Sequence, residues 1–351
     1  MKTTLVRSVK WALIALLSAG LLAYVRRIPW ISALATMQHA SFELLALALC
    51  FHFLALTGKA GIWWTFLEPL GGPRFTTVAR GTLMGATLNS LFIGSSGEAG
   101  RVVLMSRLTG IPSASVLSTV VLERAVDLCG YLSLLACAAF LYPVARTLSF
   151  FALGALGIVA TLAIAQRLRG GRETRCVPDV GESNAIVVRC RRFIQGVFES
   201  TRAIATRRRL GTALALTLVD WCSELASYSL VARAAHFPIG VSGSLLVLLA
   251  VNVGFLVRVT PGNVGVFELV YASVAHSLGL ATDTALGVAL LLHLVQDVPT
   301  TLLGLTLGMR FFGRARSPDA LGRRESAPER PMIAVTHSPT LPTESARGIS
   351  P

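Results

Sequence analysis

Charged residues are scarce in this chain. Asp, Glu, Lys and Arg make up 14% of its 351 residues, whereas hydrophobic residues make up 53%. Soluble domains carry about 25% charged residues, so this low content excludes an ordinary soluble protein. The composition predicts an integral membrane protein.

Paired cysteine motifs and catalytic motifs are lacking as well. Four of the six cysteines lie in apolar segments, and Cys176 and Cys190 share a polar loop without a CxxC pair or a histidine at metal-ligand spacing. We therefore expect no disulfide framework, no metal site and no cofactor. The sequence contains no P-loop, HExxH motif, nucleophile elbow or dinucleotide-binding glycine pattern, so we expect no enzyme. Acid–base chemistry by carboxylates and a histidine in a membrane cavity is the alternative.

Acidic residues are outnumbered by basic ones, 18 to 32, which gives a net charge of +14. The basic residues lie in the hydrophilic connections between apolar segments, as topology signals do, and this placement argues against nucleic-acid binding. Residues 166–209 carry eleven arginines and four acids, and residues 310–351 carry seven arginines and four acids. Both segments, and the basic N-terminus, are predicted to be cytoplasmic.

Long apolar segments are abundant. A helix needs about 20 apolar residues to cross the hydrocarbon core. The candidate spans are residues 11–25, 41–57, 118–142, 147–165, 210–234 and 284–309. Two further apolar stretches are interrupted, residues 78–108 by a break at 94–97 and residues 244–278 by a break at 261–265. Irregular backbone at membrane depth persists only where protein or a water-filled cavity covers it.

If the basic segments are cytoplasmic, the number of membrane crossings requires each interrupted stretch to return to the side of the membrane from which it entered. The predicted fold is all-α, a polytopic helical bundle with two re-entrant half-helix pairs that enter from opposite faces as an inverted repeat. The predicted transmembrane domain covers residues 1–310, with a first module at about 40–165, a basic cytoplasmic loop at 166–209 and a second module at about 210–310. Residues 311–351 are predicted to be a disordered cytoplasmic tail.

A faint internal similarity agrees with a repeat. Shifting the chain by 170 residues lays the segment from Gly110 over the segment from Leu280, with Glu123 on His293 and Asp127 on Asp297. Residues at i and i+4 share one face of a helix. A polar pair on one helix face thus recurs in each half.

The first break carries two opposite charges. Ser95 or Ser96 would cap the second half-helix, whose free N–H groups and partial positive charge around Gly97 suit a phosphate. Arg101 would add a bidentate grip on phosphate oxygens, and Glu98 would hold Arg101 at i+3. The alternative is a Glu98–Arg101 pair at the cytoplasmic interface without a ligand.

The second break repeats this pattern. Gly262 and Gly265 follow Pro261, Glu268 lies one turn into the new half-helix, and Arg258 precedes the break. We expect a second lipid-binding helix start, and the alternative is a structural kink with Arg258 extended to the interface. Two asparagines, one before each break, are expected to satisfy freed backbone groups: Asn89 and Asn252.

Polar residues on the neighbouring helices are expected to form a cavity charge network. Glu123 and Asp127 share a helix face, with Arg124 rotated away by about 100°. The candidate partners of this acidic pair are Arg101, Arg107 and Arg258. A structural ion-pair lock is the alternative.

Two further polar pairs occur at i and i+4. His293 and Asp297 form either a proton relay or a hydrogen-bonded packing pair. Asp220 and Glu224 lie near the start of a span, where exposure at the interface is the expected explanation.

The segment SSGEAGRVVLMSRLTGIPSASVLSTVVLERAVD resembles the transmembrane region of lysylphosphatidylglycerol synthases, a family of flippase-like membrane proteins. A break, then G-E, an arginine and E-R-x-x-D match the first family signature, and P-G-x-x-G followed by a glutamate matches the second. Gly94 stands where the family commonly has proline, and Phe267 and His293 stand where it often has arginine. The resemblance covers about residues 10 to 310. It implies lipid movement between leaflets through a cavity between two re-entrant modules, without the aminoacyl-transferase domain.

We therefore expect a multi-pass protein of the cell inner membrane that moves a polar, anionic or aminoacylated lipid between leaflets. In this interpretation both termini are cytoplasmic, Arg101 contacts the lipid phosphate, and Glu98, Glu268 and the cavity charges shape the path. The alternative is a non-transporting membrane partner that recruits a lipid- or glycan-modifying enzyme through its basic loop and tail. The sequence leaves the identity of the lipid and the oligomeric state open.

Overall fold

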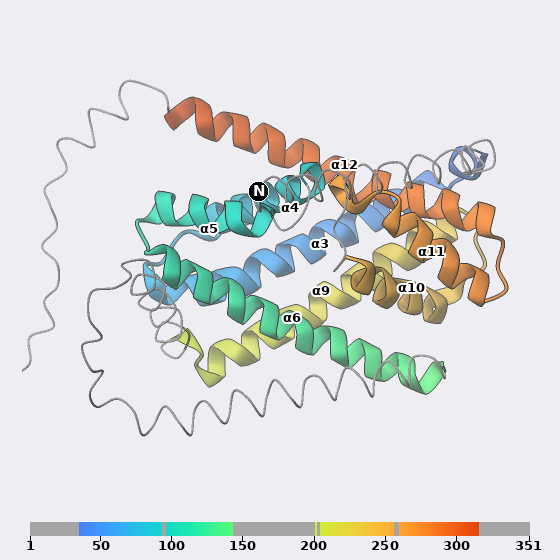
Figure 1. The fold of residues 1–351 in the computed structure, drawn as a ribbon, viewed down its shortest axis with the longest axis horizontal. Helices are drawn as coiled ribbons and strands as arrows, with labels where there is room; N and C mark the ends of the chain where they lie inside the picture. The colour runs from blue at the N-terminus through green and yellow to red at the C-terminus, as the bar shows by residue number, and fades with distance from the viewer. Residues whose placement is uncertain (1–34, 93–95, 143–200, 202–203, 256–259, 316–351) are drawn as a thin grey trace, which may run out of the picture. The chain divides into compact units, whose positions relative to one another are not determined.

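The structure is helical throughout the part of the chain that it describes. This computed structural model describes residues 35–92, 96–142, 201, 204–255 and 260–315, and every regular element in these ranges is a helix (Figure 1). The all-α prediction is confirmed for these ranges. The chain divides into two compact units, residues 1–308 and 309–351, and residues 309–315 of the second unit are helical. The spans predicted at 11–25 and 147–165, most of the loop at 166–209, and the tail after residue 315 lie outside the described residues.

The first set of helices surrounds the first predicted break. It consists of α3 (Phe42–Leu67), the short 3-10 helix η1 (Glu68–Leu70), α4 (Phe75–Leu91), α5 (Ser96–Thr109) and α6 (Ser113–Leu141). The span predicted at 41–57 is too short, because α3 continues to Leu67. Lys59 ends the apolar run in the sequence, but Ile62, Trp63 and Phe66 beyond it are buried and their packing extends the helix.

The second set repeats this order of a long helix, two shorter helices around a break, and a long helix. It consists of α9 (Arg207–Ala234), α10 (Gly240–Gly254), η2 (Pro261–Asn263), α11 (Val266–Ser277) and α12 (Thr282–Ala315). The 170-residue shift lays Ser96, where α5 begins, on Val266, where α11 begins. The sequence similarity and the order of the helices therefore agree.

The long helices α3 and α9 lie side by side (Figure 1). The Ser41 N–H donates to the Ala234 carbonyl at 2.9 Å, which joins the start of α3 to the end of α9, so the two helices run in opposite directions. Each set of helices also has its own buried cluster of apolar side chains. One cluster contains Trp63 and Met105, and the other contains Tyr271 and Leu292. These clusters fix the helices that carry the polar residues described next.

Close packing between α6 and α9 requires glycine at position 130. A Cβ atom at Gly130 would lie 2.6 Å from Cδ1 of Trp221 on α9. We expect Gly130→Ala to displace this indole and to destabilise the protein by about 1–3 kcal/mol, the usual cost of overpacking. The measurement is the thermal unfolding midpoint in detergent. The control is Gly211→Ala on α9, since no neighbouring atom of the described residues lies within 4 Å of a Cβ atom built at Gly211, and alanine there stabilises a helix by about 0.5–1 kcal/mol. Equal midpoints for the two variants would contradict the close contact.

Candidate functional site

The first break separates α4 from α5. α4 ends at Leu91 and α5 begins at Ser96. The Gly97 N–H donates to the side-chain oxygen of Asn89 at 2.9 Å, which confirms the prediction that Asn89 satisfies a freed backbone group. α4 therefore caps the start of α5. Ser95 and the side chain of Ser96 lie outside the described part of the chain.

Arg101 joins α5 to α6. Its side chain is 5% exposed, and Nη2 lies 2.9 Å from Glu98 Oε2 and 2.7 Å from Glu123 Oε2. The guanidinium carbon also lies 4.6 Å from the ring centre of Trp63, within the range of a cation–π contact. The predicted pair of Arg101 with Glu98 is present, and of the three candidate arginines for Glu123 it is Arg101 that binds it. Because both carboxylates bind one buried guanidinium, Arg101 is better placed to hold two helices together than to present a free charge.

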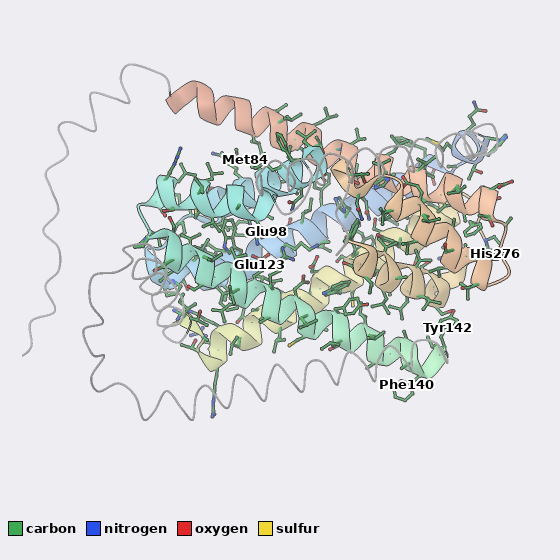
Figure 2. All side chains as sticks on the ribbon, in the orientation of Figure 1. Met84, Glu98, Glu123, Phe140, Tyr142 and His276 are labelled. Atoms are coloured by element: carbon green, nitrogen blue, oxygen red, sulfur yellow. The ribbon has the colours of Figure 1, made fainter. Side chains whose placement is uncertain are left out.

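Arg124 is the exposed cation of this cluster, with a side chain that is 51% exposed. Nη1 donates to Asp127 Oδ2 at 3.2 Å, and Nη2 pairs with Glu98. Figure 2 shows Glu98 and Glu123 in the region between α5 and α6. The position of Arg124 is rotated from the face shared by Glu123 and Asp127, but its long flexible side chain folds back along α6, so Arg124 joins the predicted charge network with Glu98 and Asp127.

Two carboxylates predicted at the membrane interface are instead inside the protein. Asp220 is 2% exposed, and its Oδ2 lies 3.9 Å from Nζ of Lys59. Glu224, one turn further along α9, lies with Oε2 3.7 Å from Nδ1 of His52. The interface prediction is wrong because α3 packs against this face of α9 and supplies a basic partner for each acid. Lys59 and His52 were not among the predicted site residues.

The second break is capped by its own helix. The backbone at Gly265 has φ 92°, a left-handed conformation that favours glycine. The Gly265 N–H donates to Glu268 Oε2 at 2.6 Å, and Glu268 Oε1 lies 2.8 Å from Nδ1 of His293 on α12. Asn252 donates to the carbonyl of Leu248 in its own helix at 2.9 Å and so does not fulfil the prediction made for it. Arg258 lies outside the described residues.

Glu98 and Glu268 have equivalent places in the two sets of helices. Each is the third residue of its half-helix, and each binds the long helix that follows, Glu98 through Arg124 and Glu268 through His293. Phe267, the other position where the family resemblance leads one to expect arginine, lies with its ring centre 4.4 Å from that of His293. The second set thus has a ring contact at the two positions where arginines were expected.

α12 also binds the end of α4. Asp297 Oδ1 accepts a hydrogen bond from Ser90 Oγ at 3.3 Å, and Asp297 Oδ2 lies 3.4 Å from His293 Nε2. Gly262 approaches the same place, since a Cβ atom there would lie 3.4 Å from the Ser90 carbonyl oxygen. The two breaks therefore meet, although they are far apart in the sequence.

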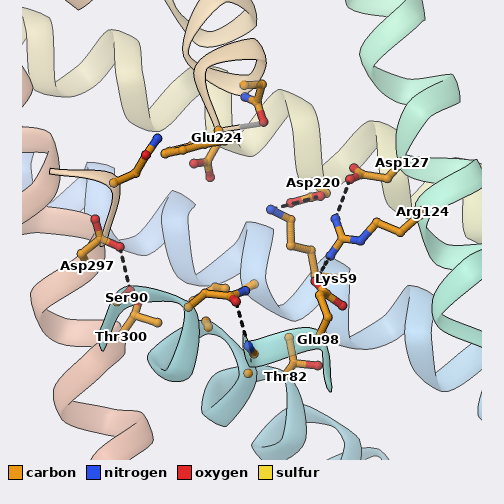
Figure 3. Close-up of a pocket in the computed structure, with 18 of the residues that line it drawn as sticks. Lys59, Thr82, Ser90, Glu98, Arg124, Asp127, Asp220, Glu224, Asp297 and Thr300 are labelled. Carbon is orange, nitrogen blue, oxygen red and sulfur yellow. Dashed lines mark hydrogen bonds and ion pairs between the residues drawn. The ribbon is translucent and has the colours of Figure 1, made fainter. Parts of the chain in front are cut away.

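Most of these residues line one cavity of about 650 Å³. Figure 3 shows Lys59 facing Asp220, Arg124 between Glu98 and Asp127, and Asp297 beside Ser90. The charged residues on the described wall are Lys59, Glu98, Arg101, Glu123, Arg124, Asp127, Asp220, Glu224 and Asp297. Six carboxylates thus face three permanent cations, so the wall carries excess negative charge when all are ionised. Of the other predicted site residues in the described ranges, Gly97 and Gly262 line the cavity, whereas Gly265, Glu268 and His293 do not.

Charged residues that line a cavity among apolar helices define a class of protein. Three helical segments in the described ranges are long and apolar enough to cross a membrane: Phe42–Leu70, Ser113–Leu141 and Thr282–Leu307. The molecule is therefore a polytopic helical membrane protein with an internal polar cavity.

A comparison with protein families identifies the family to which this membrane protein belongs. Residues 11–304 match the family described as the lysylphosphatidylglycerol synthase TM region, and the chain belongs to this family. No curated protein matches the chain. Family membership indicates a function connected with membrane lipids.

Proposed function

We propose that this protein is a lipid translocase that moves a polar lipid between the leaflets of the membrane without changing it chemically. The observation that carries the proposal is the cavity of about 650 Å³, which has charged walls although apolar helices form it. A lipid headgroup needs such a polar environment at membrane depth, because charged groups there are costly unless they are paired. Its acyl chains can remain against the apolar outer surface of the bundle.

The topology of the proposal follows the charge distribution. α4 with α5 and α10 with α11 form two re-entrant pairs, which enter from opposite faces of the inner membrane as an inverted repeat, with both termini in the cytoplasm. The positions of the arginine-rich segments support this orientation. The recurrence of the helix order and the meeting of the two breaks support the repeat.

The charged cavity residues have two proposed roles: some hold helices together and others bind the lipid. Arg101 is buried between two carboxylates, and in the proposal it holds α5 against α6. Arg124 and Lys59 are more exposed, with side-chain exposures of 51% and 43%, and are proposed to meet the lipid phosphate. The carboxylates of Asp127 and Asp220 beside them would receive a headgroup ammonium. The proposed lipid is thus anionic or aminoacylated.

The test is translocation of fluorescent lipids in proteoliposomes. A panel of anionic, aminoacylated and isoprenoid-linked lipids is compared with protein-free vesicles at equal pH on both sides. We expect at least one phosphate-containing lipid to move faster with protein present. A folded protein that moves no lipid in the panel would contradict the proposal. It would favour the recruitment of a lipid- or glycan-modifying enzyme, to be sought by co-purification with the full chain and its loss on deletion of residues 170–205.

A further inference from the structure

A second polar cluster borders the cavity where three long helices meet. His52 comes from α3, Glu224 from α9 and Thr300 from α12. His52 Nε2 lies 3.0 Å from Thr300 Oγ1, and His52 Nδ1 lies 3.7 Å from Glu224 Oε2. His52 and Thr300 are buried, at 9% and 4% exposure, yet all three residues line the cavity. A group on this cluster is therefore shielded by protein but reachable from the cavity.

The two nitrogens of the His52 ring differ in their hydrogen bonding among the described residues. Thr300 occupies Nε2, whereas Nδ1 has no hydrogen-bond partner among the described residues. The distance of 3.7 Å to Glu224 exceeds hydrogen-bond length. A neutral imidazole has one donor and one acceptor nitrogen, and a proton on the second makes both nitrogens donors. A proton on Nδ1 would convert this gap into an imidazolium–carboxylate pair.

The charges around His52 and Glu224 favour the binding of a proton. Lys59 is paired with Asp220 and Arg124 with Asp127 and Glu98, so each nearby cation already has an acid. The titratable and charged groups that share the described cavity wall with His52 and Glu224 are Lys59 on α3, Glu98 and Arg101 on α5, Glu123, Arg124, Asp127 and Tyr131 on α6, Asp220 and Tyr228 on α9, and Asp297 on α12. The described lining residues of α4, α10 and η2 add only uncharged groups. Carboxylates exceed cations in this set, which leaves negative charge for a proton to compensate.

The same turn of α12 is tied to the first half-helix. The Thr300 carbonyl accepts a hydrogen bond from Thr87 on α4 at 3.4 Å. Pro299 precedes Thr300 within α12, and a proline inside a helix removes one backbone hydrogen bond and favours bending there. Thr300 thus connects the His52 ring to α4 at a point where α12 is weakened.

We propose that His52 and Glu224 form a proton-binding site whose occupancy is coupled to movement of α4 against α12, so that this protein exchanges a proton for each lipid translocation cycle. The inference rests on the proposed function. A proton from one aqueous side binds Nδ1 of His52 and is held by Glu224. The new ion pair pulls the ring toward α9 and alters its contact with Thr300, which follows Pro299 in α12. After the lipid has crossed, the proton leaves Nδ1 for water on the other side, so the N–H bond that formed as a hydronium O–H bond broke is exchanged again for an O–H bond.

The test is lipid distribution across proteoliposome leaflets, first at equal pH and then with a gradient of one pH unit in each direction. A gradient of one unit is a tenfold difference in proton activity, so one-to-one coupling predicts up to about tenfold accumulation of lipid in one leaflet by the wild type, reversed when the gradient is reversed. We expect His52→Gln and Glu224→Gln to move lipid at equal pH without accumulation. The matched control is His276→Gln, which removes an exposed histidine of α11 that does not line the cavity and should respond as the wild type does.

The outcomes separate this inference from the proposed function. A wild type that moves no lipid at equal pH overturns the function itself. A wild type that moves lipid but ignores the gradient overturns only the coupling. Gradient-driven accumulation that persists in both His52→Gln and Glu224→Gln overturns the assignment of the site. A folded His52→Gln protein that moves no lipid even at equal pH places His52 in the lipid path and also overturns the proton role.

Discussion

Replacing Arg124 with glutamine is expected to slow lipid translocation by about 10- to 100-fold, because a hydrogen bond to a charged group contributes about 1.5–3 kcal/mol. The side chain is 51% exposed on the cavity wall, and in the proposed function it meets the lipid phosphate. Glu98 keeps its contact with Arg101 in this variant, so stability should change little. Translocation rate and thermal unfolding midpoint are measured on the same preparation.

The control for Arg124→Gln is the same substitution at Arg107. Arg107 is an exposed arginine in the last turn of α5 and does not line the cavity. We expect Arg107→Gln to transport lipid at the wild-type rate. Equal slowing by both variants would mean that only total positive charge matters. Unchanged transport by Arg124→Gln would remove this residue from the path.

Replacing Arg101 with methionine should instead unfold the site. Removing one partner of a buried ion pair costs about 3–5 kcal/mol, because the remaining charge stays buried without compensation. Glu123, at 4% exposure, would lose the 2.7 Å contact with Arg101 and keep only a contact of 3.8 Å with Arg124, which is weaker compensation, whereas Glu98 would keep its closer pair with Arg124. We expect a large fall in the thermal unfolding midpoint and poor recovery of folded protein in detergent.

A double variant separates the loss of charge balance from the loss of packing. Arg101→Met with Glu123→Leu replaces the buried pair by apolar side chains, an exchange that is often neutral for stability. We expect it to recover most of the stability that Arg101→Met loses. A double variant as unstable as the single one would show that the contact with Trp63, not the charge pair, holds α5 in place.

The sequence allowed the breaks and several helices to be predicted because their causes are local. Apolar runs mark α3, α6 and α12, and the glycine-rich breaks lie where α4 ends before α5 and where η2 precedes α11. The pair of Arg101 with Glu98 follows from the spacing on one helix, whereas the need of a buried charge for a partner predicted that Glu123 binds an arginine but not which one.

The missed residues depend on which helices are neighbours. Lys59 and His52 lie on α3, and the carboxylates that they face lie about 160 residues later on α9. Periodicity places a side chain on a helix face but does not say which helix packs on that face.

The capping of the second break by its own helix has a local signal in the sequence, because a glutamate three residues after the N-cap is the capping-box spacing. Gly265 and Glu268 have this spacing and form the hydrogen bond.

The most direct test of the central claim is to fill the cavity. Ala86 on α4 lines it, whereas Val103 on α5 is 47% exposed and does not. Ala86→Trp and Val103→Trp add the same indole to the same pair of helices, and both are reconstituted with the wild type for lipid translocation. We expect Ala86→Trp to stop lipid movement and Val103→Trp to move lipid at the wild-type rate. Wild-type movement by a folded Ala86→Trp protein would contradict the central claim, since lipid would then cross by a route outside the cavity.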